Sequence, residues 1–444
     1  MSAGEDALSS RPPANRWLIA LAGAGLQLAL GTVYAWSYFQ KLLMDPKRFP
    51  GLEHWKNWEV ALAFSLAILF LGVSAAVGGM LLGKWGPRKL AMLGGLLFGG
   101  GYLIGALGLH WHSLPVLYLG YGVIGGSGLG LGYVTPVATA AKWFPDKKGL
   151  VTGMVVMGFG FGALLMSLVL APMLRRWTGD DLVLVFAILG IVFLCWTLPM
   201  GAVLRNPPAG YVPPGWTPPV AAAGAASAEG PAARAIFSPR FLMMWAVFFC
   251  NITAGVAILA FQSPLMQDLW AKTDPSLGKE ALATCGAMLI AVSSLFNGFG
   301  RFGWGGLSDR IGRTNAFRAM LATQLAVFVA MVFTRNPWLF GAMVCYVLLC
   351  YGGGFGTMPS FVLDVFGAKR MAVVYGAILT AWAAAGVAGP VIFAAIRDHF
   401  PESELEKAST WSFGVAAGFL AVGAVLSLLL SNRPMREEEA RPSV

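Results

Sequence analysis

The sequence predicts an all-α membrane protein in which twelve transmembrane helices form two six-helix bundles. The first observation is composition: 57% of the 444 residues are apolar and 12% are charged, whereas soluble domains carry about 25% charged residues. The second is a series of apolar stretches long enough to cross about 30 Å of hydrocarbon. The third is a proline-rich interruption near mid-chain. Because lipid admits only helices or closed barrels, and no alternating strand pattern is present, we expect helices.

The first apolar stretch begins at Trp17, after a polar segment that contains Glu5 and Asp6. Its length suits a membrane span better than the core of a secretory signal. The twelve predicted spans are 17–38, 58–82, 90–110, 114–140, 149–173, 182–204, 240–266, 282–306, 315–334, 338–362, 371–396 and 409–430.

Between Arg205 and Pro239 the chain is rich in proline, alanine and glycine and contains no apolar span. Such a composition is typical of a linker. It separates six predicted helices from six. The predicted organisation is a cytoplasmic tail (1–16), a six-helix bundle (17–204), a cytoplasmic linker (205–238), a second six-helix bundle (239–431) and a cytoplasmic tail (432–444).

Two loops occur twice along the chain, which indicates an internal duplication. GGMLLGKWGPRK (78–89) matches GGLSDRIGRT (305–314), and KWFPDKKG (142–149) matches DVFGAKRM (364–371). Both pairs repeat at nearly the same spacing. Duplication of a helical unit is the usual construction of a secondary transporter.

The basic residues predict the orientation of the chain. Nineteen of the 31 Lys and Arg residues fall on the side of the two termini and eleven on the other side. The positive-inside rule therefore places both termini in the cytoplasm. The expected location is the cell membrane. All 21 acidic residues fall in loops or at span ends, and the one cation left inside a span is Arg301.

Arg301 is the predicted centre of the functional site. An arginine in the middle of a membrane is costly and usually faces the protein interior. Because no carboxylate in a span can balance it, the expected counter-ion is a bound anion, held bidentately if it is a carboxylate. Asn297 lies one helical turn earlier and can donate a further hydrogen bond. The alternative is an arginine that snorkels or caps the carbonyls of a broken helix.

Aromatic residues at similar depth complete the candidate binding site. Tyrosine hydroxyls can donate to a carboxylate while the rings enclose a small apolar body, although each residue could equally serve packing. The candidates are Tyr34, Tyr133, Tyr351, Tyr375 and Trp382. No metal-binding or cofactor motif accompanies them.

These features resemble the major facilitator superfamily, and within it the oxalate/formate antiporter and monocarboxylate transporter group. The segments that carry the resemblance are GTVYAWSYF, KWFPDKKGLVTG, NGFGRFGWGGLSDRIGR, FGTMPSFVLDVFGAKR and VYGAILTAWAAAGVAGP. The resemblance implies that Arg301 binds the substrate carboxylate, assisted by Tyr34 and Tyr133. It also implies a cytoplasmic gate at the repeated loop, where we expect Asp309, Arg310 and Arg313 to act.

Three positions depart from the pattern of that group. The oxalate antiporter has a lysine where this chain has Trp382, so a single fixed cation favours a monoanion over oxalate. Animal monocarboxylate carriers have an aspartate where this chain has Asn297, and an asparagine side chain has no carboxyl group that could carry a proton. Gly83 replaces the acid expected in the first loop motif, so the gate is expected to rest on Asp309.

The sequence therefore predicts a secondary active transporter of small monocarboxylates, similar to lactate, pyruvate, acetate or formate, that works by alternating access. The alternative is an oxalate/formate or other organic-anion antiporter. Symport with a proton and anion exchange both stay open, and exchange suits a carrier that must reorient a buried cation. An enzyme is disfavoured because no acid or histidine cluster lies in the spans, and a receptor because no signalling domain is evident. The expected partners are a carboxylate anion, a proton as candidate coupling ion and the lipid bilayer, without nucleic acid, and the expected state is a monomer.

Overall fold

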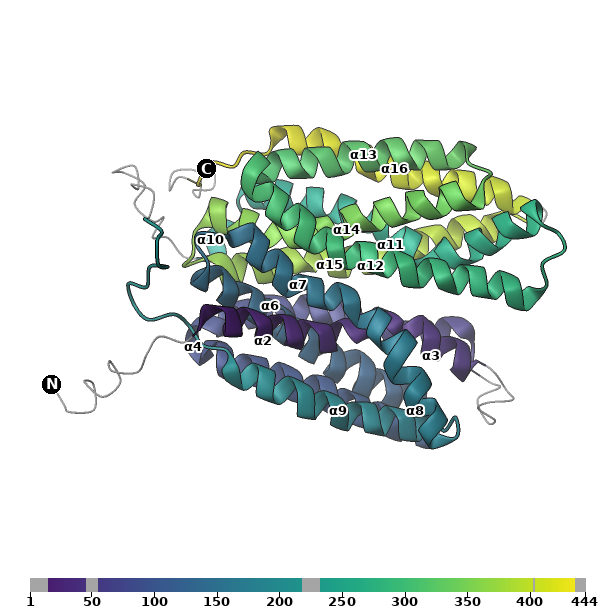
Figure 1. Cartoon of the computed structure of the whole chain (residues 1–444), viewed down its shortest axis with the longest axis horizontal. Helices are drawn as coiled ribbons and strands as arrows, with labels where there is room; N and C mark the ends of the chain where they lie inside the picture. Colours follow the sequence, from purple (N-terminus) through teal and green to yellow (C-terminus); the bar gives the residue numbers. More distant parts are fainter. Residues whose placement is uncertain (1–14, 45–54, 218–231, 402–403, 436–444) are drawn as a thin grey trace.

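The computed structural model describes residues 15–44, 55–217, 232–401 and 404–435. Every regular element in these ranges is a helix, and the all-α membrane fold is confirmed. The start of α2 (Arg16–Leu30) and the end of α16 (Leu405–Leu429) lie at the same end of the molecule (Figure 1), which we call the terminal face. The predicted tails and linker lie partly outside the described residues, because 1–14, 218–231 and 436–444 are not among them.

The helices of the first half lie together in the lower part of Figure 1. The first helical span is interrupted by a 3₁₀ turn (η1), and two others contain π-helical turns (η2 and η3). The elements are α2 (Arg16–Leu30), η1 (Gly31–Ala35), α3 (Trp36–Leu43), α4 (Asn57–His110), α5 (Leu114–Leu117), η2 (Tyr118–Gly125), α6 (Gly126–Trp143), α7 (Lys148–Leu165), η3 (Met166–Leu170), α8 (Ala171–Thr178) and α9 (Leu182–Val203).

The helices of the second half lie together in the upper part of Figure 1. The six of them that match predicted spans are longer than those spans, because an apolar window marks the hydrocarbon core whereas the helix continues into polar residues beyond it. The elements are α10 (Ala232–Ile236), α11 (Pro239–Thr273), α12 (Lys279–Ile311), α13 (Arg313–Phe333), α14 (Pro337–Phe366), α15 (Met371–His399) and α16 (Leu405–Leu429).

The structure corrects the prediction of a loop over 83–89. Within the described ranges, eleven helices are long and apolar enough to span a membrane, and one of them, Trp58–His110, has 53 residues. At about 1.5 Å per residue it is more than twice as long as the hydrocarbon is thick. Its backbone leaves the helical conformation only at Gly86 (φ 75°, ψ 163°), and Pro87 starts the next turn. Helix α4 therefore crosses twice, which restores twelve crossings.

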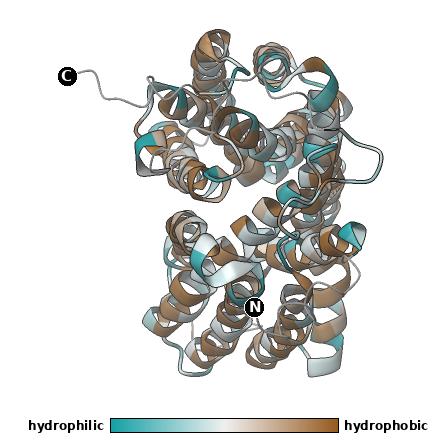
Figure 2. Ribbon diagram, turned by 90° about the vertical axis from the view of Figure 1, so that its left-hand side faces the viewer, coloured by the Kyte–Doolittle hydropathy of each residue, from teal (hydrophilic) through white to brown (hydrophobic). Residues whose placement is uncertain are grey.

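The two halves meet along two seams, α7 against α12 and α4 against α15. Viewed from the terminal face, the helices run side by side and apolar residues dominate their ribbons (Figure 2). Helix α12 lies between α7 of the first half and α14 of the second. A Cβ atom at Gly153 of α7 would lie 2.5 Å from the Arg301 carbonyl oxygen, and a Cβ atom at Gly356 of α14 would overlap the same carbonyl. Glycine at both positions therefore lets the backbone of α12 approach its neighbours at the depth of Arg301.

Candidate functional site

Arg301 lies on α12 and has no exposed surface. Its Nε donates to Asn297 Oδ1 at 3.4 Å, and its Nη1 donates to the Tyr133 hydroxyl at 3.3 Å and to the Val156 carbonyl at 3.4 Å. Its Nη2 is buried without a hydrogen-bond partner in the part of the chain that the structure describes. The guanidinium therefore retains one nitrogen that can donate to a ligand.

Two aromatic rings cover the guanidinium. The Cζ atom of Arg301 lies 5.3 Å from the ring centroid of Phe159, on α7, and 4.6 Å from that of Phe355, on α14. Cation–π contacts of this kind stabilise a desolvated cation by about 2 kcal/mol. Within the described ranges no carboxylate forms an ion pair with Arg301, so the rings and the long hydrogen bonds leave the positive charge without a counter-ion.

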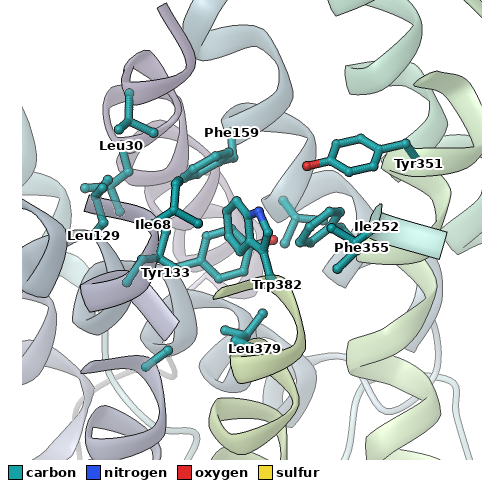
Figure 3. Packing of buried hydrophobic residues seen from close by; sticks show 14 of the residues in the cluster. Leu30, Ile68, Leu129, Tyr133, Phe159, Ile252, Tyr351, Phe355, Leu379 and Trp382 are labelled. Atoms are coloured by element: carbon teal, nitrogen blue, oxygen red, sulfur yellow. The ribbon is translucent and has the colours of Figure 1, made fainter. Parts of the chain in front are cut away.

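Trp382 of α15 packs against three other aromatic rings beside Arg301. We call the four residues the aromatic wall: Trp382, Tyr133, Phe159 and Phe355. The ring centroid of Trp382 lies 4.7 Å from that of Phe355, 5.4 Å from that of Tyr133 and 5.5 Å from that of Phe159. Figure 3 shows Trp382 between Tyr133 and Phe159 on one side and Phe355 on the other. Rings from both halves of the chain therefore enclose one small region.

A hydrogen bond joins the two halves at this site. The hydroxyls of Tyr34, in the 3₁₀ turn η1, and Tyr351, on α14, lie 2.9 Å apart. Tyr34 also packs against Phe159, with centroids 5.2 Å apart, and against Trp382, with centroids 6.0 Å apart. The Tyr34–Tyr351 pair therefore closes another side of the aromatic wall.

The structure brings the seven predicted binding residues together. Tyr375, on α15, is fully buried and lies beside Tyr133 and Arg301. The remaining six are linked by the contacts above. That these residues bind substrate stays a prediction.

Phe159 and Phe355, the two phenylalanines that cover Arg301, were not predicted from the sequence, because a phenylalanine in a membrane span usually serves packing. One available signal is helical spacing: Phe355 follows Tyr351 by four residues, so both project from the same face of α14.

A second polar cluster joins the halves at the terminal face. Asp309, near the end of α12, accepts hydrogen bonds from the amides of Gly149 at 3.0 Å and Leu150 at 2.9 Å, in the first turn of α7. A carboxylate at this place satisfies otherwise unpaired amides and interacts favourably with the helix dipole. An acid of the second half thus caps a helix of the first.

Three further charged side chains extend this cluster. Arg313 binds Asp309 (Nη2–Oδ1, 2.6 Å) and Asp364 (Nε–Oδ2, 2.9 Å), and Lys148 binds Asp364 (Nζ–Oδ1, 2.8 Å). We call Asp309, Arg313, Asp364 and Lys148 the latch. Lys148 and Asp364 were not predicted as gate residues, although both lie in the repeated loops that the sequence shows.

Arg310 takes no part in the latch. It is exposed and forms none of the ion pairs found among the described residues. The first-half counterpart of Asp309 is Gly83, and a Cβ atom there would meet nothing within 4 Å. The repeated loop therefore places an acid at the seam between α7 and α12 and none at the seam between α4 and α15.

No group of three or more His, Cys, Asp and Glu side chains is arranged to hold a metal ion within the described ranges.

Comparison with known proteins identifies relatives of the chain. The sequence profile of the Major Facilitator Superfamily matches residues 14–390. The oxalate:formate antiporter of Oxalobacter formigenes is 29% identical, over 87% of this chain and 86% of its own. The apicoplast pyruvate carrier 1 of Toxoplasma gondii is 28% identical, over 71% of this chain and 66% of its own. The solved structure of the proton:xylose symporter XylE has the same fold, with a TM-score of 0.66 at 14% identity over 96% of this chain and 98% of that one.

Proposed function

The chain belongs to the Major Facilitator Superfamily, and we propose that it carries small monocarboxylates, such as lactate, pyruvate or acetate, across the cell membrane by alternating access. The observation that carries the proposal is Arg301, a fully buried cation with a free Nη2 and no carboxylate partner among the described residues. A bound carboxylate would supply the missing charge. The names of the two relatives, an oxalate:formate antiporter and a pyruvate carrier, agree with a small organic anion.

Charge balance favours a monoanion. One guanidinium neutralises one carboxylate, and a buried charge without a partner is strongly unfavourable. A dicarboxylate would leave a second negative charge facing the rings of Trp382, Phe159 and Phe355. The aromatic wall suits a short apolar body instead.

The hydrogen-bond pattern suggests how a carboxylate would be held. Nη2 of Arg301 can donate to one carboxylate oxygen. The Tyr133 hydroxyl already accepts from Nη1 at 3.3 Å, so its own proton can be donated to the substrate. In the Tyr34–Tyr351 pair only one hydroxyl donates to the other, so the second proton is also available. We therefore expect Arg301 and Tyr133 to orient the carboxylate, with Asn297 holding the arginine.

Anion exchange is the coupling that this site favours. Without substrate, the carrier would have to reorient a buried positive charge, and a bound anion removes that cost. Proton symport would need a titrating group elsewhere. An oxalate/formate-type antiporter is the second candidate, supported by the relative of that name and opposed by the single fixed cation.

We also propose that both termini face the cytoplasm and that 17–204 and 239–431 are the two moving units. The excess of basic residues on the terminal face supports this orientation. A reporter enzyme fused to the C-terminus, active only in the cytoplasm, tests it. An inactive reporter in cells that insert the full-length protein would contradict the orientation.

Counterflow in proteoliposomes tests the substrate proposal. Vesicles loaded with unlabelled lactate or pyruvate should accumulate labelled lactate, and Arg301→Ala should abolish this uptake. Arg176→Ala, which removes an exposed arginine on α8, is the matched control and should transport like the wild type. Exchange of oxalate that is stronger than exchange of lactate would favour the second candidate, and full activity of Arg301→Ala would reject the site.

A further inference from the structure

The segment after α16 is tied to three other helices of the second half. Asn432 Oδ1 accepts from the Thr314 amide, in the first turn of α13, at 3.0 Å. The Arg433 carbonyl accepts from Arg240 Nη1, near the start of α11, at 2.7 Å. The Met435 amide donates to the Val365 carbonyl, near the end of α14, at 2.9 Å. We call residues 432–435 the strap.

The strap contacts the chain next to both second-half partners of the latch. Thr314 follows Arg313, and Val365 follows Asp364. The strap therefore forms a hydrogen bond with the backbone of the residue next to each of these two charged residues. Met435 also buries its side chain, which is 6% exposed. The strap thus joins the beginning of α13 to the end of α14 across the place where Arg313 and Asp364 meet.

The contact with Thr314 is a helix cap. Helix α13 begins at Arg313 directly after Gly312, which has no side chain with which to cap it. The Asn432 side chain takes the capping role from another part of the chain. The end of α16 from which the strap starts is itself fixed, because Arg318 donates to the Ser427 carbonyl at 3.1 Å and to the Leu428 carbonyl at 3.1 Å.

We propose that the strap is a regulatory element, which sets how firmly the latch closes the terminal face by holding Arg313 and Asp364 in position for Asp309 and Lys148. Loosening it should let the amides of Gly149 and Leu150 separate from Asp309 more often. This inference goes beyond the proposed function, because it concerns the opening of the terminal face whichever anion is carried. It would fail independently of the substrate proposal.

Hydrogen exchange at Gly149 and Leu150, followed by mass spectrometry of the purified full-length protein without substrate, tests the strap. Both amides bond to Asp309, so their exchange reports opening of the latch directly. Asn432→Ala should raise this exchange by about five-fold, the size expected for one lost cap. Truncation after Ser431 should raise it further.

Three controls make the result decisive. Arg433→Ala keeps the backbone carbonyl that the strap uses, and truncation after Met435 keeps the whole strap, so both should exchange like the wild type. Asp309→Asn weakens the latch itself and should increase exchange. If Asp309→Asn increases exchange while Asn432→Ala and the truncation after Ser431 do not, the strap does not restrain opening of the latch and the proposal is wrong. Unchanged exchange in all variants overturns it as well, because the latch would then not protect these amides.

Discussion

Lys148 and Asp364 form a 2.8 Å ion pair that joins α7 of the first half to α14 of the second. The two side chains are 31% and 25% exposed, so water and salt screen the pair. The same carboxylate also binds Arg313, whose side chain is 6% exposed. Asp364 is therefore shared between a partly exposed lysine of one half and a nearly buried arginine of the other.

This sharing predicts unequal effects of the two partners on stability. We expect Asp364→Ala to lower the thermal unfolding midpoint more than Lys148→Ala, because it removes two ion pairs instead of one. The double variant should have an unfolding midpoint close to that of Asp364→Ala alone. In a double-mutant cycle, the interaction free energy between Lys148 and Asp364 should be about 0.2–1 kcal/mol. Lys147→Ala, an exposed neighbour, is the control. Strictly additive shifts would show that Lys148 and Asp364 do not interact.

Gly83 occupies the position at which Asp309 stands in the second half. We therefore predict that an acid at residue 83 would hold the seam between α4 and α15 closed. Gly79, one turn earlier on α4, lies against the backbone of Ala372 and Val373 in the first turn of α15, and space is open beside Gly83. We expect Gly83→Asp to cap α15 as Asp309 caps α7, and so to slow counterflow several-fold. Gly83→Asn, of similar size without the charge, should slow it less.

Equal rates for Gly83→Asp and Gly83→Asn would contradict a charge-dependent lock. Increased exchange of the α15 amides in Gly83→Asp would contradict the capping geometry. Hydrogen exchange at Ala372 and Val373 measures the second outcome.

The helices were predictable because a membrane imposes length and hydropathy on every span. The break at Gly86 was not placed correctly, because the sequence GKWGPRK resembles a loop while the chain stays helical on both sides of one glycine. The division of the chain into units at 17–204 and 239–431 stays a prediction. Polar ends of helices such as α11 carry no apolar signal, so their length could not be predicted.

The candidate site was partly predictable from charge. Arg301 was identified because no acid in a span balances it, but the residues around it depend on how helices of both halves pack. The choice between Arg310 and Arg313 could not be predicted from helical spacing, because the backbone leaves the helical conformation at Gly312 (φ 89°, ψ 150°) and Arg313 begins another helix. The contacts of Phe159 and Phe355 with Arg301 depend on how α7 and α14 pack against α12, and the local sequence indicates only that Phe355 shares a helix face with Tyr351.

The aromatic wall predicts that a second cation would change the charge of the substrate. Trp382→Lys would place an ammonium beside Arg301, where the rings of Tyr133 and Phe355 now lie within 5.4 Å of the indole centroid. We expect the ratio of oxalate to lactate counterflow to rise by about ten-fold or more, since each neutralised buried charge is worth more than 1.4 kcal/mol. Trp382→Phe, which opens space without charge, should leave the ratio unchanged. A similar rise in Trp382→Phe would assign selectivity to volume.

The hydrogen bond from Arg301 Nη1 to Tyr133 predicts a role for the hydroxyl in substrate affinity. In Tyr133→Phe the ring can keep its contacts with Phe159 and Trp382, whose centroids lie 5.1 Å and 5.4 Å away, while the donor to the carboxylate is lost. A hydrogen bond to a charged group contributes about 1.5–3 kcal/mol, so we expect the Kd for lactate to rise at least ten-fold. Lactate-dependent thermal stabilisation measures this. Tyr346→Phe, which removes a hydroxyl bonded to Thr323 away from Arg301, is the matched control, and equal stabilisation of both variants by lactate would remove Tyr133 from the binding site.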